Sequence, residues 1–252
     1  MSHAIKSLIT FWTLFFLCCT LRAPKINEYV ITRAFDDIVI DGTLSESDWE
    51  RARCTEAFVY FEDGSEPVFL TQAKILWDDT HLYIAFICQD DDVWSKFCER
   101  DRPLWHGEAV EIFCDPDGDG LNYIEIQINP LGAVLDLLMD KAYFSGGTAD
   151  RTFEFADLEV GVSVNGTLND LNHNDTLWSC EVALPFRSFA DFSPSINVPP
   201  EDGDSWRLNL CRYERQRTGR KITEITCWNQ TDRRGFHVPE KFGSMVFRKN
   251  VP

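Results

Sequence analysis

Residues 70–88, with the sequence LTQAKILWDDTHLYIAFIC, contain the clearest structural signal in the chain. Two runs rich in β-branched and aromatic residues, 70–77 and 81–88, flank the polar triplet Asp78-Asp79-Thr80. Because Asp side chains favour tight turns by hydrogen-bonding the backbone two residues on, the two runs are predicted to pair as an antiparallel hairpin.

The same pattern recurs along the chain, while a sustained 3.6-residue repeat is nearly absent. Residues 122–129 and 133–139 flank Pro130-Leu131-Gly132, which predicts a second hairpin. The other predicted strands are 38–40, 57–61, 109–115, 158–164, 177–184, 206–213, 222–228 and 244–247. We therefore predict an all-β fold, an antiparallel two-sheet β-sandwich of jelly-roll type.

One short helix is expected, at residues 45–53. Ser45 can cap its first turn, and Trp49 can fold back onto the core. Three further tryptophans, Trp77, Trp178 and Trp206, lie in apolar patterns typical of core residues.

The N-terminal residues 1–23 differ from the rest of the chain. The apolar run 8–21 follows a short charged start, and it is shorter than the roughly 20 residues that a membrane-spanning helix needs. This predicts a signal peptide, with an N-terminal anchor, lipid-linked at Cys18 or Cys19 or left uncleaved, as the alternative. Residues 24–252 are expected to form one domain, secreted or periplasmic, or held at a membrane only through the N-terminus.

The charge balance excludes most nucleic-acid binders. The chain has 24 Lys and Arg against 41 Asp and Glu, a net charge of -17. Proteins that bind a polyanion rely on basic side chains that release counterions from phosphates. A neutral or cationic partner is therefore expected.

Motifs for a catalytic nucleophile, a phosphate loop or a zinc protease are absent from the sequence. Glu108 and Glu111 are three residues apart, so on one strand they point to opposite faces. Glu111 and Glu125, from neighbouring strands, could converge as the carboxylate pair of a glycosidase. A glycoside-active enzyme is thus an alternative rather than the leading hypothesis.

The segment from Asp115 to Gly120, DPDGDG, places carboxylates at Asp115, Asp117 and Asp119, the first, third and fifth positions of an EF-hand loop. The closing glutamate is missing, since Ile126 stands at the twelfth position. A plain turn explains the same residues, so a structural calcium site is one of two interpretations.

Trp105 stands in a polar loop that runs directly into a predicted strand. A large ring in such a loop either packs locally or remains exposed as a binding platform. Flat aromatic faces stack on the C–H groups of sugar rings, and carboxylates and amides bind the hydroxyls, so Trp105 is a candidate for sugar binding.

Five blocks of residues, in order, resemble the family 9 carbohydrate-binding modules and the stand-alone bacterial proteins similar to them, over residues 29–247. The blocks are Ile38-Val-Ile-Asp-Gly-Thr-Leu-Ser-Glu-Ser-Asp-Trp49, Leu76-Trp-Asp-Asp-Thr-His-Leu-Tyr-Ile84, Trp105-His-Gly-Glu-Ala-Val-Glu-Ile-Phe-Cys-Asp-Pro-Asp-Gly-Asp-Gly120, Tyr123-Ile-Glu-Ile-Gln-Ile-Asn-Pro-Leu-Gly132 and Trp228-Asn-Gln-Thr-Asp-Arg-Arg-Gly-Phe-His-Val-Pro-Glu-Lys-Phe-Gly243. The resemblance implies a β-sandwich with structural calcium that holds a sugar between two tryptophans.

When the ligand-binding positions of the family are transferred to the matching positions of this sequence, the resemblance implies a ligand site at five residues. Trp105 matches the first stacking tryptophan and Glu111 a strand glutamate, while Gln127 stands where the family has arginine. Phe236 replaces the second tryptophan and Arg233 a preceding asparagine, so the set of groups that reads the hydroxyls differs from the family's.

The leading hypothesis is therefore non-catalytic binding of a neutral oligosaccharide or polysaccharide. Besides the enzyme, a haem-binding sandwich domain is an alternative, which would use Met139 or Met245 with one of the scattered histidines.

Overall fold

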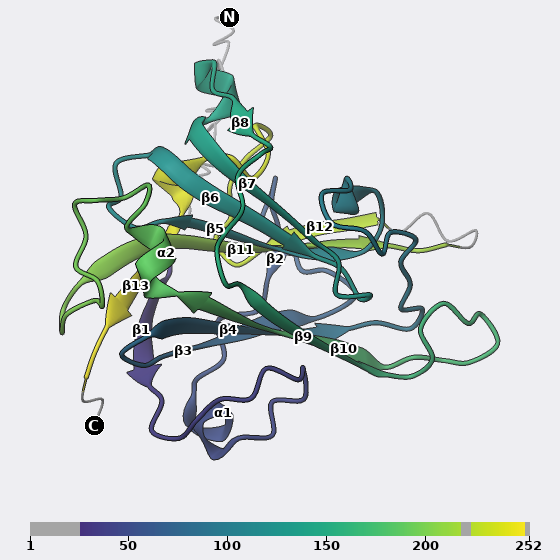
Figure 1. Ribbon diagram of the computed structural model, residues 1–252. Helices are drawn as coiled ribbons and strands as arrows, with labels where there is room; N and C mark the ends of the chain where they lie inside the picture. Colours follow the sequence, from purple (N-terminus) through teal and green to yellow (C-terminus); the bar gives the residue numbers. More distant parts are fainter. Residues whose placement is uncertain (1–25, 218–222, 250–252) are drawn as a thin grey trace, which may run out of the picture.

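The computed structural model describes residues 26–217 and 223–249 and contains one strongly curled, 13-stranded sheet whose two halves face each other as layers (Figure 1). The predicted signal peptide or anchor at 1–23 lies outside these residues. The strands are β1 (Glu28–Arg33), β2 (Val59–Tyr60), β3 (Thr71–Trp77), β4 (His81–Gln89), β5 (Ala109–Asp115), β6 (Leu121–Ile128), β7 (Val134–Lys141), β8 (Ala149–Asp150), β9 (Glu159–Asn165), β10 (Leu177–Pro185), β11 (Ser205–Arg215), β12 (Thr223–Cys227) and β13 (Gly243–Phe247).

The strand order along the sheet is β8-β7-β6-β5-β11-β13-β1-β3-β4-β10-β9, with β12 beside β11 and β2 beside β12. Strand β1 joins the two layers: its residues 28–31 pair with β13 and its residues 32–33 pair with β3. Both of these pairings are parallel. The prediction of a purely antiparallel sheet is therefore wrong, and the sheet is mixed.

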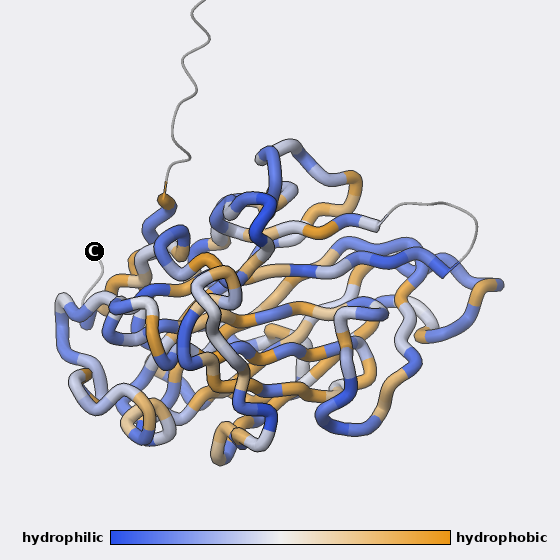
Figure 2. The backbone as a smooth tube through the Cα atoms, turned by 90° about the horizontal axis from the view of Figure 1, so that it is seen from above, coloured by the Kyte–Doolittle hydropathy of each residue, from blue (hydrophilic) through white to orange (hydrophobic). Residues whose placement is uncertain are grey.

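The main core fills the space between the layers, because alternate side chains of facing strands point inward. Ile75 and Trp77 of β3 belong to it, together with Ile112 of β5, Ile126 of β6 and Leu208 of β11. Figure 2 shows apolar stretches along the central strands and mostly polar loops around them. The predicted core positions of Trp49, Trp77, Trp178 and Trp206 are confirmed, since each is at most 2% exposed.

Both predicted hairpins are present, β3–β4 and β6–β7, in antiparallel register. Residues 38–40 were expected to be a strand but pair with no other strand. Instead, Ile38 and Ile40 pack on a second apolar cluster around Trp49 and Leu76, which covers the outer side of the β3–β4 layer. The alternation of apolar residues at 38–40 thus arises because Ile38 and Ile40 cover an apolar surface, although this segment forms no strand.

The expected helix at 45–53 is shorter, α1 (Ser47–Arg51), and its N-cap residue is Glu46, not Ser45. A second short helix, α2 (Phe186–Phe189), was not expected. Within 26–217 and 223–249, the helices are too short or too polar to traverse a bilayer.

The turn at Asp41 and Gly42 lies against strands β9 and β10. The Glu181 carboxylate accepts hydrogen bonds from the backbone N–H groups of Asp41, at 3.0 Å, and Gly42, at 2.6 Å. The Ser179 hydroxyl donates to the Gly42 carbonyl at 2.5 Å. A Cβ on Gly42, whose φ is +88°, would stand 2.5 Å from the carbonyl carbon of Val162. The close approach therefore requires glycine.

A cluster of charged side chains is buried between the layers. Arg212 of β11 donates to Asp90 at 2.8 Å and also binds Glu214, and all three side chains are at most 2% exposed. Glu108 lies beside them with neither carboxylate oxygen hydrogen-bonded. Burial raises the pKa of Glu214 to about 9, and burial followed by the charges of Glu214 and Asp90 raises the pKa of Glu108.

Candidate functional site

A hollow of about 250 Å³ lies on the outer face of the layer formed by β5, β6, β7 and β11. Even-numbered residues of β5 and β6 point into the core, so odd-numbered residues point to this face. The residues that line the hollow are Trp105, Glu111, Phe113, Glu125, Gln127, Leu137, Tyr143, Arg151, Tyr213, Gly235, Phe236 and His237. We call it the outer-face hollow.

The polar part of the outer-face hollow comes from β5 and β6. Glu111 and Gln127 are direct cross-strand partners, and Glu125 stands two residues before Gln127 on the same face. The Gln127 amide donates to Glu125 Oε1 at 2.6 Å. Glu125 Oε2 and Gln127 Oε1 are buried without a hydrogen bond. The sequence left open whether the carboxylates of Glu111 and Glu125 come together, and the fold places both in the lining of one hollow.

Glu111 is the most isolated titratable group of the hollow. Its side chain is 2% exposed, and no hydrogen bond or ion pair joins it to another residue of the described ranges. Burial, and secondarily the charge of Glu125, raises the pKa of Glu111 well above its usual range. The Glu111 carboxyl would therefore be stabilised by a ligand that donates hydrogen bonds or carries positive charge.

His237 connects the hollow to its wall. Its Nε2 lies 3.2 Å from Glu125 Oε2, and its Nδ1 lies 3.0 Å from the Tyr123 hydroxyl. The ring also contacts Tyr143 at a centroid distance of 4.5 Å. A histidine that looked scattered in the sequence is thus brought to the hollow by the loop before β13.

The aromatic lining differs partly from expectation. Trp105, in the short 3₁₀ turn at Leu104–His106, is partly exposed at the hollow. Phe236 also lines it but is only 5% exposed, because its ring packs edge-on against Phe61 and Tyr213. Tyr143, which the sequence did not single out, is 48% exposed and lines the same hollow.

Of the five expected ligand residues, Trp105, Glu111, Gln127 and Phe236 therefore meet at one place. Arg233 does not line the hollow and is exposed in the turn before Gly235. Exposed Arg151, which follows β8, is the arginine that the fold brings to the rim instead.

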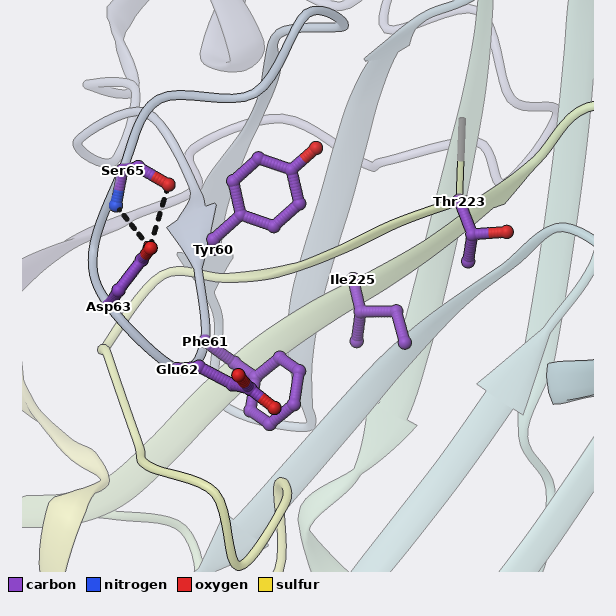
Figure 3. Close-up of a pocket in the computed structure, with 7 residues that line it drawn as sticks. All are labelled: Tyr60, Phe61, Glu62, Asp63, Ser65, Thr223 and Ile225. Carbon is purple, nitrogen blue, oxygen red and sulfur yellow. Dashed lines mark hydrogen bonds between the residues drawn. The ribbon is translucent and has the colours of Figure 1, made fainter. Parts of the chain in front are cut away.

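A second hollow, of about 280 Å³, lies beside β2 and β12 (Figure 3). Three of its polar side chains already have partners: the Asp63 carboxylate accepts from the Ser65 amide at 2.9 Å and from the Ser65 hydroxyl at 2.7 Å, and the Tyr60 hydroxyl donates to Glu224 at 2.8 Å. The Phe61 ring, which lines this hollow, contacts Phe236 of the first at 5.5 Å. The outer-face hollow, with its unpaired polar atoms, is the better candidate.

The acidic loop between β5 and β6 brings its three aspartates together. One carboxylate oxygen each of Asp115, Asp117 and Asp119 lies within 4.8 Å of the others. Asp115 also accepts from the Gly118 amide at 3.0 Å and the Gly120 amide at 2.9 Å, as a turn would require. The pKa of Asp115 is raised to about 6: burial raises it most, the hydrogen bonds from Gly120 and Gly118 lower it, and the charges of Asp117 and Asp119 add a smaller upward shift.

Residues 40–250 match the model of the carbohydrate family 9 binding domain-like family. The chain belongs to this family. The resemblance read from the five sequence blocks is thereby confirmed. A curated relative of this family 9 domain, the "Extracellular protein" of Arthroderma benhamiae, is 22% identical over 188 residues, which are 72% of this chain and 80% of the relative.

Three solved structures share the fold at 15% identity each. A candidate carbohydrate-binding protein from Bacteroides uniformis has a TM-score of 0.68, over 88% of this family 9 domain's chain and 100% of its own. A family 9 module from Caldicellulosiruptor kristjanssonii in complex with cellotriose has a TM-score of 0.60, over 89% of this chain and 95% of the module. The glucose complex of a family 9 module from the same organism has a TM-score of 0.59, over 88% of this chain and 96% of the module. The likeness confirms the expected β-sandwich architecture.

Proposed function

We propose that this chain binds carbohydrate without catalysis, and that the sugar occupies the outer-face hollow. The observation that carries the proposal is the partly exposed Trp105 beside a floor of buried, incompletely hydrogen-bonded side chains, Glu111, Glu125 and Gln127. A sugar ring offers an apolar face for the indole and hydroxyl donors for the floor. The family membership and the sugar-bound structural neighbours support the same function.

We propose that Trp105 is the principal stacking ring, with Tyr143 as a second exposed ring and Phe236 as an edge-on wall. Tyr143 takes this role because it is 48% exposed whereas Phe236 is 5% exposed. The ligand class is a neutral or cationic glycan, since the net charge of -17 repels acidic ones. A small ligand held by two rings and a few hydrogen bonds corresponds to a Kd of ~10 μM to ~1 mM.

Trp105→Ala is expected to weaken binding of cellotriose at least tenfold, about 1.4 kcal/mol, because the stacking face is lost. Calorimetric titration measures the affinity. It is preferred to tryptophan fluorescence because the variant lacks the Trp105 ring that would report binding. Phe35→Ala is the control: Phe35 is 75% exposed and is not among the residues that line the hollow.

Unchanged affinity in Trp105→Ala would contradict the assignment of the hollow. Chromatography of the ligand after the titration tests the alternative of a glycoside-active enzyme. Recovery of intact cellotriose is expected, whereas cleavage products that disappear in Glu125→Gln would favour the enzyme.

We also propose that the acidic loop binds a structural calcium ion through Asp115, Asp117 and Asp119. Three mutually close carboxylates repel one another unless a cation neutralises them. Saturating calcium is expected to raise the Tm by several degrees, at about 2–4 °C per kcal/mol of stabilisation for a domain of this size.

Thermal unfolding with calcium and with a chelator tests the calcium site. The double variant Asp117→Asn, Asp119→Asn is expected to lose the calcium-dependent shift, and Asp191→Asn, exposed elsewhere, is expected to keep it. An equal shift in the double variant would locate calcium binding elsewhere.

We infer that the protein acts outside the cytoplasm, secreted, periplasmic or attached to a membrane by its N-terminus. The apolar run at 8–21 and the extracellular designation of the fungal relative support this inference. The export would bring the domain to the glycans that it is proposed to bind.

A further inference from the structure

The unused hydrogen-bonding capacity at the floor of the outer-face hollow consists mainly of acceptors. The Glu111 carboxyl has no hydrogen-bond donor among the described residues, and Gln127 Oε1 is buried without one. Glu125 Oε2 has only His237 Nε2 nearby, at 3.2 Å and without hydrogen-bond geometry. One N–H of the Gln127 amide already donates to Glu125 Oε1 at 2.6 Å, which leaves its second N–H beside the unpaired amide oxygen. Free acceptors therefore outnumber free donors at the floor, which makes it complementary to a ligand group that donates several hydrogen bonds.

The floor also lacks a compensating cation at Glu111. Of the two basic side chains in the lining, His237 lies 3.2 Å from Glu125, and Arg151 is exposed at the rim. The charge that acts on the pKa of Glu111 is that of Glu125, which is negative and adds to the effect of burial. An ionised carboxylate is costly to bury without a partner, so a cationic ligand group would stabilise the ionised form of Glu111 and gain a charge-assisted hydrogen bond at this point.

We propose that the outer-face hollow selects a sugar that carries an ammonium group, such as the 2-amino-2-deoxyglucose units of a β-1,4-linked glucosamine oligomer. An ammonium group has three hydrogen-bond donors, no acceptor and one positive charge. It therefore matches the floor both in hydrogen bonding and in charge. A hydroxyl at the same carbon supplies one donor and no charge. An acetamido group adds a carbonyl acceptor that would face other acceptors, and it removes the charge.

This proposal rests on the proposed function, because it names the class of sugar for the same site. The test therefore uses three trisaccharides with the same linkage that differ only at the second carbon of each ring: glucosamine trimer, N-acetylglucosamine trimer and cellotriose. Calorimetry on the full chain in one near-neutral buffer is expected to give an affinity for the glucosamine trimer on the order of tenfold higher than for cellotriose.

Glu111→Gln is the decisive variant, because it keeps the shape of the side chain but cannot ionise to pair with an ammonium group. It is expected to bring the affinities for glucosamine trimer and cellotriose to within about twofold of each other. Glu159→Gln, exposed on β9 of the opposite layer, removes the same charge from the chain and is expected to preserve the preference. Together they separate a local contact from general attraction between an acidic protein and a polycation.

Each outcome decides between the two proposals. Equal affinities for the three trisaccharides, or a preference that survives Glu111→Gln, would overturn the amino-sugar inference and leave carbohydrate binding intact. Failure of all three to bind would overturn the proposed function as well. Thermal unfolding checks that Glu111→Gln is folded, and Glu125→Gln repeats the test if it is not.

Discussion

Arg212→Met is expected to lower the free energy of unfolding by about 3–5 kcal/mol, because it leaves buried carboxylates without their cation. The Arg212 guanidinium is 1% exposed and binds both Asp90 and Glu214. It also donates to the Gln89 carbonyl at 2.7 Å and the Thr71 hydroxyl at 3.1 Å. Removal of the guanidinium takes a donor from each of these acceptors, although Asp90 keeps the hydrogen bond from the Asp92 amide.

Urea unfolding at neutral pH measures this loss. Arg207→Met on the same strand is the matched control, since Arg207 is only partly buried and donates one hydrogen bond, to the Phe242 carbonyl at 3.2 Å. It is expected to change stability by less than about 1 kcal/mol. If the two variants were equally stable, the buried cluster could not depend on its arginine.

The cluster also predicts a pH dependence with a defined sign. The pKa of Glu214 is raised from 4.5 to about 9 in the folded protein, so between these values the folded state holds a proton that the unfolded state releases. Stability from this group is full below about 4.5 and is lost as the pH rises through about 9.

Glu108→Gln is expected to reduce the fall in stability between mildly acidic and alkaline pH, because it removes a neighbouring negative charge from the same cluster. Urea unfolding at several pH values compares its slope with that of the unmodified protein. An unchanged slope would assign the pH dependence to other groups.

Gly42→Ala is expected to destabilise the protein by about 2–4 kcal/mol, through backbone strain and a steric clash. The alanine would adopt a φ of +88° and place its Cβ 2.5 Å from the Val162 carbonyl carbon and 2.6 Å from the Ser163 nitrogen. The turn would have to lift from β9, which breaks its hydrogen bonds to Glu181 and Ser179.

Two alanine variants separate these effects. Gly132→Ala has a similar φ of +75° with no atom within 4 Å of the new Cβ, so it carries the strain alone, about 1 kcal/mol. Gly161→Ala meets the Asp41 backbone at 2.7 Å without a positive φ, so it carries the clash alone. Urea unfolding of Gly42→Ala should therefore show a larger loss than Gly132→Ala, and equal losses would exclude the clash.

The sequence predicts the strands of this fold better than their directions. Residue alternation identifies both hairpins, because short turns enforce antiparallel pairing. The parallel pairings of β1 involve residues far apart in the chain, and a single sequence contains no signal for them. Residues 38–40 alternate because they cover an apolar surface, so alternation alone does not establish a strand.

The candidate site was predictable where it lies on strands. Glu111 and Gln127 share a face because β5 and β6 pair, and the family resemblance added Trp105 and Phe236. Tyr143 and His237 lie in short irregular segments after β7 and before β13, and only the folded chain brings them together. The sequence likewise gave no indication of which way Arg233, in the loop at 232–235, would point.

Strand β1 has a consequence for synthesis of the protein on the ribosome. Glu28 pairs with Ser244, 216 positions later (244 minus 28), so the seam between the layers cannot close until nearly the whole domain has been translated. At about 5–20 residues per second, the edge of β1 that receives β13 waits roughly 10–40 s for its partner. During that interval the nascent chain exposes an unpaired strand edge, and β1 is therefore the segment where we expect chaperones to bind and intermolecular pairing to begin.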